Sequence, residues 1–295
     1  MPDDNIKSFG GKWSDEKLGA LKEYLRAYTT ALKNAPFKLT YIDAFAGAGT
    51  REVAADKDAD WFDESILEED VQYRHGSPLI ALGTEPSFHE FFFIERDPES
   101  MDRLKNEVRD NFPVQEKKVS FLPGDANQVI QSLTSKRWDS RRAVAFLDPF
   151  ALHVTWETIE KIARTQAIDM WLLFPAMAIN RMMPKHGEIP EAWASKLTET
   201  FGCEEWRKFF YEKSEPDLFG EATLSKSDKF FQRLSEFITM RLKTVFAGAH
   251  ESPLILRNKS GAPIFLLCFA CGNPKGVQLA TRIAQHIINK KNHGK

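Results

Sequence analysis

Four carboxylates stand where a predicted buried strand passes into a turn. They are Asp43, Glu95, Asp125 and Asp148. The carboxyl ends of parallel strands meet at one edge of a sheet, which is where open α/β sheets bind their ligands. Because an ionised carboxylate only accepts hydrogen bonds, such an edge suits a ligand that offers amino and hydroxyl groups. Acids after the first three strands, in order, are a more specific signal than any one of them alone.

Asp43 opens a glycine-containing loop, Asp43-Ala-Phe45-Ala-Gly47-Ala-Gly49. Gly47 and Gly49 would let the backbone turn sharply and approach a ligand that a Cβ would exclude. The alternative is an ordinary turn. An NAD site would need a third glycine and an immediate helix. Here the third position is Glu52 and an acidic segment follows, which counts against a dinucleotide.

Glu95 and Asp125 follow the second and third predicted strands. A carboxylate in the position of Glu95 can accept hydrogen bonds from both ribose hydroxyls of a nucleoside. Asp125, which precedes Ala126, can accept a hydrogen bond from an adenine amino group. The alternatives are a plain surface role for Glu95, and capping of the next helix by Asp125 or Asn127.

Asp148-Pro149-Phe150 ends the fourth predicted strand. It resembles the Asp/Asn-Pro-Pro-Tyr/Phe motif of methyltransferases that act on amino groups, with one proline where that motif has two. The resemblance implies that the Asp side chain and the Pro carbonyl accept hydrogen bonds from the target NH2 while the aromatic ring stacks on the target. The alternative is a strand-ending turn.

Three basic residues follow the fifth predicted strand at the same edge of the sheet. Arg181, Lys185 and His186 are the best candidates for contacting an anionic substrate. Solvated loop charges are the alternative interpretation.

The helices and strands expected around these groups indicate a doubly wound α/β fold with seven strands, the last of them antiparallel. A helix capped by Ser14 precedes the first strand, with an apolar stripe that starts at Leu18 and ends at Leu32. The strands and their exits are expected at 39–44, 88–97, 119–127, 143–150, 168–175, 253–261 and 262–271.

Two segments interrupt this pattern within a single predicted domain, 1–295. The insertion 51–75 carries nine acidic residues against three basic ones, and it is either a mobile surface insertion or a lid on the substrate side. Residues 191–243 are helical and rich in aromatic residues, within a predicted helical subdomain of about 185–248. A packed core of its own is favoured there over an aromatic surface that stacks on bases.

Composition favours a globular cytoplasmic protein. The hydrophobic content of 42% is enough for a large core, and no run approaches the roughly 18 apolar residues of a membrane span. The amino terminus lacks signal-peptide features, and three cysteines suit a reducing compartment. The net charge of −2 does not support a nucleic-acid partner, although it leaves room for a local basic patch.

A metal site is not expected. Cys268 and Cys271 form a C-x-x-C pair, but positions three apart on a strand point to opposite faces. With Cys203 as the remaining cysteine and no nearby histidine pair, a tetrahedral zinc site is disfavoured.

The combination of motifs resembles the three-Cys-motif partner protein family of bacteria and archaea. The stretches that carry this resemblance are Trp13-Ser-Asp-Glu-Lys-Leu, Tyr41-Ile-Asp-Ala-Phe-Ala-Gly-Ala-Gly, Gly76-Ser-Pro, Phe146-Leu-Asp-Pro-Phe, Gly187-Glu-Ile-Pro-Glu-Ala-Trp, Pro253-Leu-Ile-Leu-Arg-Asn, Leu266-Leu-Cys-Phe-Ala and Asn273-Pro-Lys-Gly. The resemblance implies a methyltransferase-like fold and a partnership with a separate three-Cys-motif protein that is similar to radical S-adenosylmethionine enzymes.

The expected function is therefore S-adenosylmethionine-dependent, in-line methyl transfer to an amino group, with a nucleobase as the first acceptor to consider. The acidic insertion would repel phosphates, which keeps protein and small-molecule acceptors open. The alternative is a non-catalytic nucleotide-binding module that docks on the neighbouring protein. The expected roles are the methionine part for Asp43, Phe45, Gly47 and Gly49, the ribose for Glu95, the adenine for Asp125 and Ala126, and the acceptor for Asp148, Pro149 and Phe150.

Overall fold

The structure is a computed structural model that describes residues 12–47, 76–213 and 224–293. Gly49 and the whole insertion 51–75 lie outside the described residues, so their predicted roles stay predictions.

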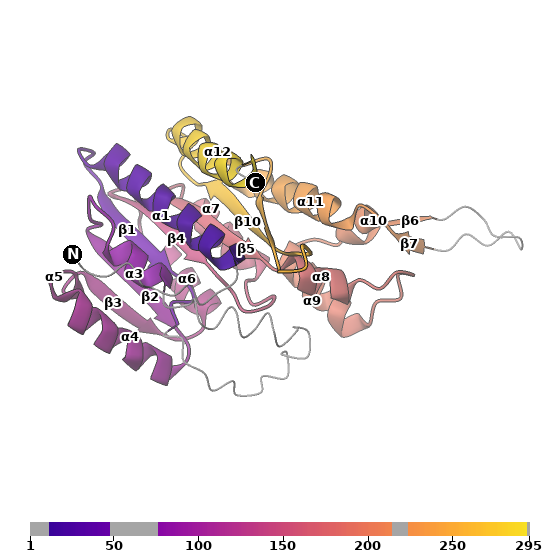
Figure 1. Cartoon of the computed structure of the whole chain (residues 1–295), viewed down its shortest axis with the longest axis horizontal. Coiled ribbons are helices and arrows are strands. Elements are labelled where there is room, and N and C mark those ends of the chain that lie inside the picture. Colours follow the sequence, from indigo (N-terminus) through magenta and orange to yellow (C-terminus); the bar gives the residue numbers. More distant parts are fainter. Residues whose placement is uncertain (1–11, 48–75, 214–223, 294–295) are drawn as a thin grey trace, which may run out of the picture.

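Helices and strands alternate along the first two thirds of the chain, as a doubly wound fold requires. Figure 1 shows their arrangement. Their bounds are α1 Lys12–Leu32, β1 Lys38–Asp43, α3 Gly76–Leu82, β2 Glu90–Glu95, α4 Pro98–Asn111, α5 Pro113–Glu116, β3 Val119–Pro123, α6 Ala126–Thr134, β4 Arg141–Leu147, α7 Trp156–Arg164, β5 Ile168–Phe174, α8 Ala176–Met182, α9 Glu191–Phe201, α10 Trp206–Phe210, β6 Tyr211–Lys213, β7 Leu224–Lys226, α11 Phe230–Val245, β8 Gly248–Ala249, β9 Leu254–Arg257, β10 Pro263–Cys271 and α12 Val277–His293.

The main sheet has the strand order β3-β2-β1-β4-β5-β10, and β9 and β8 both pair with β10. Strands β1 to β5 are parallel, whereas β10 runs antiparallel to β5 and to β9. The seven predicted strands are therefore present, with the last inserted antiparallel, and the predicted fold class is confirmed. The two-residue strand β8 was not predicted.

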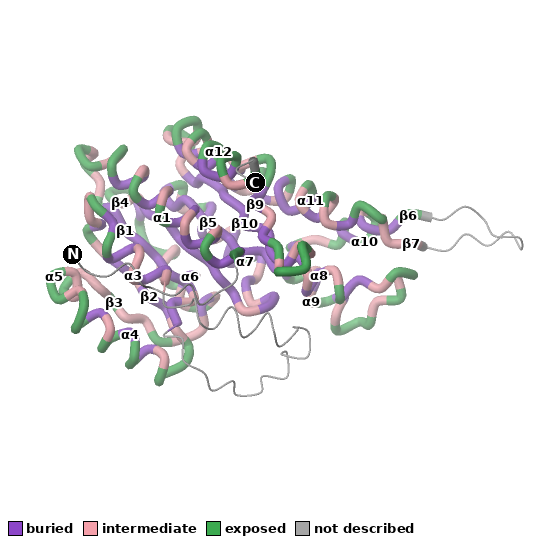
Figure 2. Tube along the Cα trace, viewed as in Figure 1, coloured by how far each residue is buried: buried purple, intermediate pink, exposed green. Residues whose placement is uncertain are grey.

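The central strands are buried on both faces. Every residue of β5 is buried, as are the last five residues of β1 and of β4. Figure 2 shows this buried layer with the exposed residues on the helices around it. Helices cover both faces of a parallel sheet, which is why these strands are continuous apolar runs in the sequence.

Successive strand residues point to opposite faces and so enter two different clusters of buried side chains. On the α1 face, Tyr41 packs with residues of α1, α3, α4 and α12. On the α7 face, Ile42 packs with residues of α6 to α11. Cys268 belongs to the α7 face and Cys271 to the α1 face, so the two thiols do point to opposite faces of β10.

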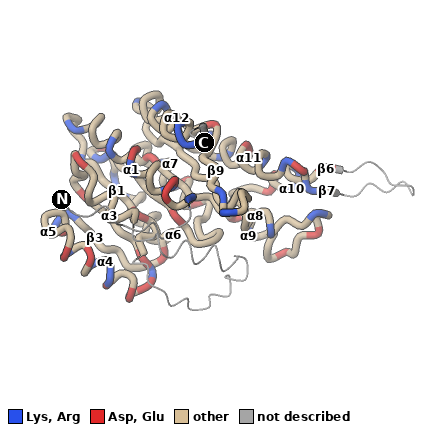
Figure 3. Tube along the Cα trace, viewed as in Figure 1, with Lys and Arg blue, Asp and Glu red and all other residues tan. Residues whose placement is uncertain are grey.

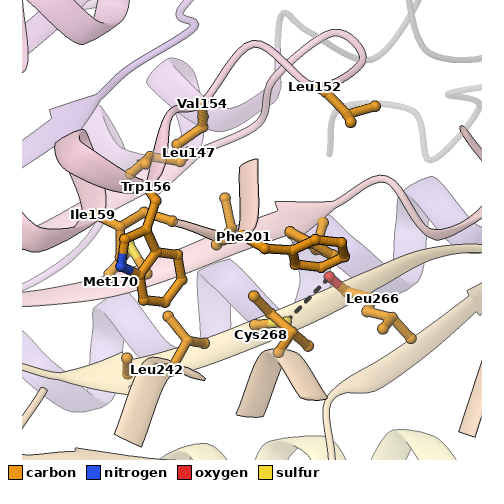
Figure 4. Packing of buried hydrophobic residues seen from close by; sticks show 14 of the residues in the cluster. Leu147, Leu152, Val154, Trp156, Ile159, Met170, Phe201, Leu242, Leu266 and Cys268 are labelled. Carbon is orange, nitrogen blue, oxygen red and sulfur yellow. Dashed lines mark hydrogen bonds between the residues drawn. The ribbon is translucent and has the colours of Figure 1, made fainter. Parts of the chain in front are cut away.

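The described aromatic residues of 191–243 pack into a core and do not form an aromatic surface, as predicted, but they share the core of the α7 face instead of having one of their own. The ring of Phe201 lies 5.9 Å from that of Phe174 on β5 and 5.1 Å from that of Phe237 on α11. Figure 4 shows Phe201 beside Cys268 of β10 and Trp156 of α7. This segment also contains the antiparallel pair β6–β7, which was not predicted. Figure 1 shows that pair at the end of the molecule opposite α4 and α5.

The amino-terminal helix differs from its prediction in one respect. Ser14 is the third residue of α1 as described and is buried, so it lies inside the helix and does not cap it. Figure 3 shows charged residues along the outer helices, whereas the strands between them are largely uncharged. Among the described residues, no helix has the length and apolar character that crossing a membrane requires.

Candidate functional site

The register of the parallel strands places three of the predicted acids at one edge. Asp43, the last residue of β1, pairs with Phe93 on β2 and with Phe146 on β4. Glu95 and Asp148 each lie two residues beyond those partners. The three carboxylates therefore come from adjacent strands at the carboxyl end of the sheet, where ligands bind in this class of fold.

The loop after β1 is held against the end of β2. The backbone N–H of Ala46 donates to the carbonyl oxygen of Ile94 at 2.8 Å, and the N–H of Gly47 donates to Oε2 of Glu95 at 2.8 Å. Gly47 has a φ of 46°, a left-handed conformation that glycine adopts without a Cβ clash. The glycine loop and the acid expected at the ribose thus form one connected unit.

Both carboxylate oxygens of Glu95 accept backbone hydrogen bonds. Oε2 takes the Gly47 N–H, and Oε1 takes the N–H of Asp97 at 2.8 Å. A carboxylate has about four lone-pair positions, so these two bonds leave acceptor capacity for ligand hydroxyls. Their main effect is to fix the carboxylate's orientation.

Asp43 is fully buried and hydrogen-bonded. The hydroxyl of Tyr41 donates to its Oδ2 at 3.0 Å, and the side chain of Ser77 on α3 donates to it as well. Burial raises the pKa of Asp43 to about 7, the two hydrogen bonds lower it, and the nearby charge of Asp148 adds to the rise. Ser77 had no predicted role at the site, because its contact with Asp43 depends on how α3 packs.

Asp125 is the N-cap of α6, with its Oδ1 accepting the Gln128 N–H at 3.1 Å. The capping alternative for Asp125 is therefore realised, while its second oxygen is not part of that bond. Asn127 does not cap the helix. Its side chain donates to the carbonyl of His153 at 2.8 Å and accepts from Thr158 at 2.8 Å, which ties α6 to the loop after β4. Ala126 is the first residue of α6 and is buried.

Asp148 forms an ion pair that the sequence did not predict. The ammonium of Lys17 on α1 lies 2.7 Å from its Oδ2, and both side chains are buried, at 0% and 4% exposed. The same ammonium lies 5.0 Å from the centre of the Trp13 ring. A signal was available, since Lys17 precedes the buried Leu21 by four residues and so shares its helix face.

The loop that follows Asp148 is compact and contains an unusual backbone conformation. The rings of Phe150 and His153 lie 6.1 Å apart. Ala151, between them, is buried and has a φ of 56°. A left-handed conformation costs an L-residue about 1–2 kcal/mol, and such strain gathers at ligand-binding segments. Pro149 and Phe150 thus lie on a tightly held turn at the same edge as Asp148.

Arg181, Lys185 and His186 are exposed, on the last turn of α8 and in the loop beyond it. The loop is anchored from the other side by Lys226 of β7. The Lys226 N–H donates to the Lys185 carbonyl at 2.8 Å, and its ammonium donates to the Asn180 carbonyl at 3.0 Å. Burial lowers the pKa of Lys226. The loop backbone is therefore fixed while the three predicted substrate-binding side chains face outward.

A small cavity of about 60 Å³ lies at the opposite end of the strands. Tyr24, Arg142, Asp169 and Cys271 line it. Arg142 and Asp169 stand at the starts of β4 and β5, far along the strands from Asp148, so this cavity is separate from the acidic edge. Within the described ranges, no group of three or more His, Cys, Asp or Glu side chains is arranged to hold a metal ion.

The strand order and the antiparallel β10 define a methyltransferase-like Rossmann fold. No protein-family model matches the sequence, and no curated protein matches it either.

Solved structures resemble the chain at low sequence identity. Protein LPL1258 from Legionella pneumophila, described with family model DUF519, is 13% identical, with 95% of this chain and 93% of that chain covered and a TM-score of 0.45. The methyltransferase domain of bacterial CtHen1 is 11% identical, with 86% and 99% covered and a TM-score of 0.40. The CcbJ methyltransferase from Streptomyces caelestis is 13% identical, with 92% and 78% covered and a TM-score of 0.28.

Proposed function

We propose that this protein is an S-adenosylmethionine-dependent methyltransferase that transfers the methyl group to an amino nitrogen. The observation that carries the proposal is the convergence of Asp43, Glu95 and Asp148 at one sheet edge, with the Gly47 turn bonded directly to Glu95. Methyl transfer from a sulfonium needs alignment of donor and acceptor more than it needs a strong base. A rigid edge that carries hydrogen-bond acceptors fits that requirement.

The carboxylates of this edge suit three different parts of the cofactor. The carboxylate of Glu95 is fixed by two backbone bonds and keeps acceptor capacity for the two ribose hydroxyls. Asp43 lies beneath the loop and would take the positively charged methionine end. Asp125 would accept from the adenine amino group with the oxygen that does not cap α6. When bound, S-adenosylmethionine supplies an electrophilic methyl group on a positively charged sulfur.

The acceptor would lie over Asp148-Pro149-Phe150. In the proposed arrangement the Asp148 carboxylate and the Pro149 carbonyl accept hydrogen bonds from the amino group, which aims its lone pair at the methyl carbon. Phe150 would stack on a planar acceptor. A nucleobase amino group is the first acceptor to test. Arg181, Lys185 and His186 would contact its anionic parts, with protein and small-molecule acceptors as the other classes.

The protein would work beside a three-Cys-motif partner protein, as its sequence resemblance implies. A second candidate function, a non-catalytic nucleotide-binding module that docks on that partner, is favoured by one observation. Asp148 is already paired with Lys17, and both oxygens of Glu95 already accept backbone bonds. The acids therefore have a role within the fold even without a ligand.

Calorimetric titration with S-adenosylmethionine and S-adenosylhomocysteine tests the proposal. We expect roughly micromolar binding by the wild type and a loss of at least about tenfold in Glu95→Ala, because hydrogen bonds to a charged group contribute about 1.5–3 kcal/mol each. Glu99→Ala, four residues further along on the exposed face of α4, is the matched control and should bind like the wild type.

Two results would contradict parts of the proposal. Absence of binding by the folded wild type, with and without the partner protein, would remove the methyltransferase assignment and leave the docking function. Equal affinity in the wild type and Glu95→Ala would place the nucleoside elsewhere. If the cofactor binds, transfer of a labelled methyl group to nucleobase, peptide and small-molecule pools then identifies the acceptor class.

A further inference from the structure

The ion pair between Lys17 and Asp148 is unusual because both of its side chains are buried. Lys17 is completely buried, and its charge lies against one oxygen of Asp148 and above the ring of Trp13. A buried charge is costly unless it is paired and well oriented. The surroundings of Lys17 therefore hold its ammonium in one place, against the carboxylate over which the proposed acceptor would bind.

The pair also has a titratable neighbour. Asp43 of β1 lies close enough for the Asp148 charge to raise its pKa. The titratable groups that face Asp148 include Lys17 from α1, and Asp43 and Tyr41 from β1. The carboxylate that Lys17 pairs with is therefore also the charge that acts on Asp43. Without Lys17, two buried negative charges would stand side by side, and one of them would have to take up a proton.

We propose that Lys17 is a positioning residue that keeps Asp148 ionised, fixed and electrically neutralised, so that the acceptor subsite takes a neutral amino group and excludes an alkylammonium ion. This inference rests on the proposed function and narrows its substrate class. A lone buried carboxylate would attract a protonated alkylamine, which has no free lone pair to attack a methyl group. A carboxylate that is already neutralised offers a hydrogen-bond acceptor without a net attraction for cations.

The bonds, electrons and proton of the methyl transfer can all be accounted for when the acceptor is a neutral amine. The amino nitrogen forms the new N–C bond with its lone pair, and the electrons of the broken S–C bond stay on sulfur as a neutral thioether. The methylated nitrogen then loses one proton to water. Since Asp148 is held in its charged form by Lys17, it orients the N–H bonds throughout and need not store that proton.

Three variants test the charge arrangement in the protein without cofactor. Lys17→Met removes the ammonium at similar length, Asp148→Asn removes the carboxylate at similar shape, and the double variant Lys17→Met/Asp148→Asn removes both. The measurement is the pH midpoint of the Asp43 carboxyl by carbon NMR. We expect the midpoint to rise by about one unit in Lys17→Met, to fall in Asp148→Asn, and to return near the wild-type value in the double variant. A purely structural Lys17 would change thermal stability and leave the Asp43 midpoint of Lys17→Met equal to that of the wild type, which would overturn the proposal.

The choice between neutral and cationic amines is tested with two probes on the protein loaded with S-adenosylhomocysteine. Cytosine presents a neutral amino group, and n-butylamine is a cation near neutral pH. We expect Lys17→Met to bind n-butylammonium about tenfold more tightly than the wild type, with cytosine binding changed less. Equal affinity of both proteins for n-butylammonium would overturn the exclusion of cations.

Folding and cofactor failures can be told apart from failure of this inference. If Lys17→Met does not fold, Asp148→Asn should still show a lowered midpoint and the double variant one near the wild-type value, and equal midpoints in these two would overturn the role of Lys17. If the wild type does not bind S-adenosylhomocysteine, the proposed function itself fails, whatever the Asp43 midpoints are.

Discussion

Tyr24 on α1 donates its phenolic hydrogen to Oδ2 of Asp169 on β5 at 2.8 Å, two helical turns beyond the Lys17–Asp148 pair. The backbone N–H of Gly272 donates to the other oxygen of Asp169 at 3.2 Å. Helix α1 is therefore fastened to the sheet by a buried polar contact near each end of the strands. This double attachment holds Lys17 in register with the carboxyl end of β4.

Tyr24→Phe should destabilise the protein by about 1–3 kcal/mol, because a buried Asp169 oxygen loses its donor. Thermal unfolding measures the effect as a few degrees at most. Tyr28→Phe is the matched control on the same helix face, since its ring lies 6.0 Å from that of Tyr24. Equal losses in the two variants would show that the bond to Asp169 is not what matters.

Asp43 should make stability fall as pH rises. Its folded pKa of about 7 exceeds the ordinary value of 3.8, so between these values the folded protein holds a proton that the unfolded chain has lost. The free energy of unfolding should therefore decrease from about pH 4 to about pH 7, by on the order of 4 kcal/mol from this group. Urea unfolding of the wild type and Asp43→Asn at about pH 5 and about pH 8 measures the difference, which should be absent from the variant's own pH profile. A parallel decline in both proteins would contradict the assignment to Asp43.

A comparison of variants at Asp125 and Asp97 distinguishes a helix-capping role from a ligand-binding role. Each accepts the backbone N–H three residues ahead, Asp125 from Gln128 and Asp97 from Ser100. Asp125→Ala and Asp97→Ala should both cost about 1 kcal/mol of stability, since both lose an N-cap. Under the proposed function, calorimetry should show weaker binding of S-adenosylhomocysteine in Asp125→Ala alone. Equal affinities in the two variants would leave Asp125 with its capping role only.

Substitution of two glycines that have a left-handed backbone conformation tests the packing of the α7 face. Gly202, at the end of α9, has a φ of 67°, and an added Cβ there would overlap the indole of Trp156. Gly261, in the β9–β10 turn, has a φ of 83° and open space around it. Gly202→Ala should cost about 2–5 kcal/mol, and Gly261→Ala about 1–2 kcal/mol, because only the first adds steric overlap to backbone strain. Chemical denaturation compares them directly, and equal costs would argue against tight packing of α9 on α7.

Much of the fold could be predicted because strand signals are local. The apolar runs of β4 and β5 identify central parallel strands by composition alone, and the position of Asp148 follows from where the run of β4 stops. The shared core of residues 191–243 could not be predicted in this way. The aromatic residues signal burial, but Phe201 meets Phe174 only through tertiary packing.

The sequence by itself determined the order of the elements and placed Asp43, Glu95 and Asp148 at strand ends, because hydrophobic periodicity and strand termination are properties of short stretches of chain. Only the tertiary structure decided that Lys17 lies beside Asp148 and that Ser77 donates a hydrogen bond to Asp43. It also decided between the two alternatives for the cap of α6, where one oxygen of Asp125 accepts a backbone hydrogen bond. A helical lysine is ordinarily solvated. Its burial here follows from the way α1 crosses the sheet, which brings together residues 131 positions apart.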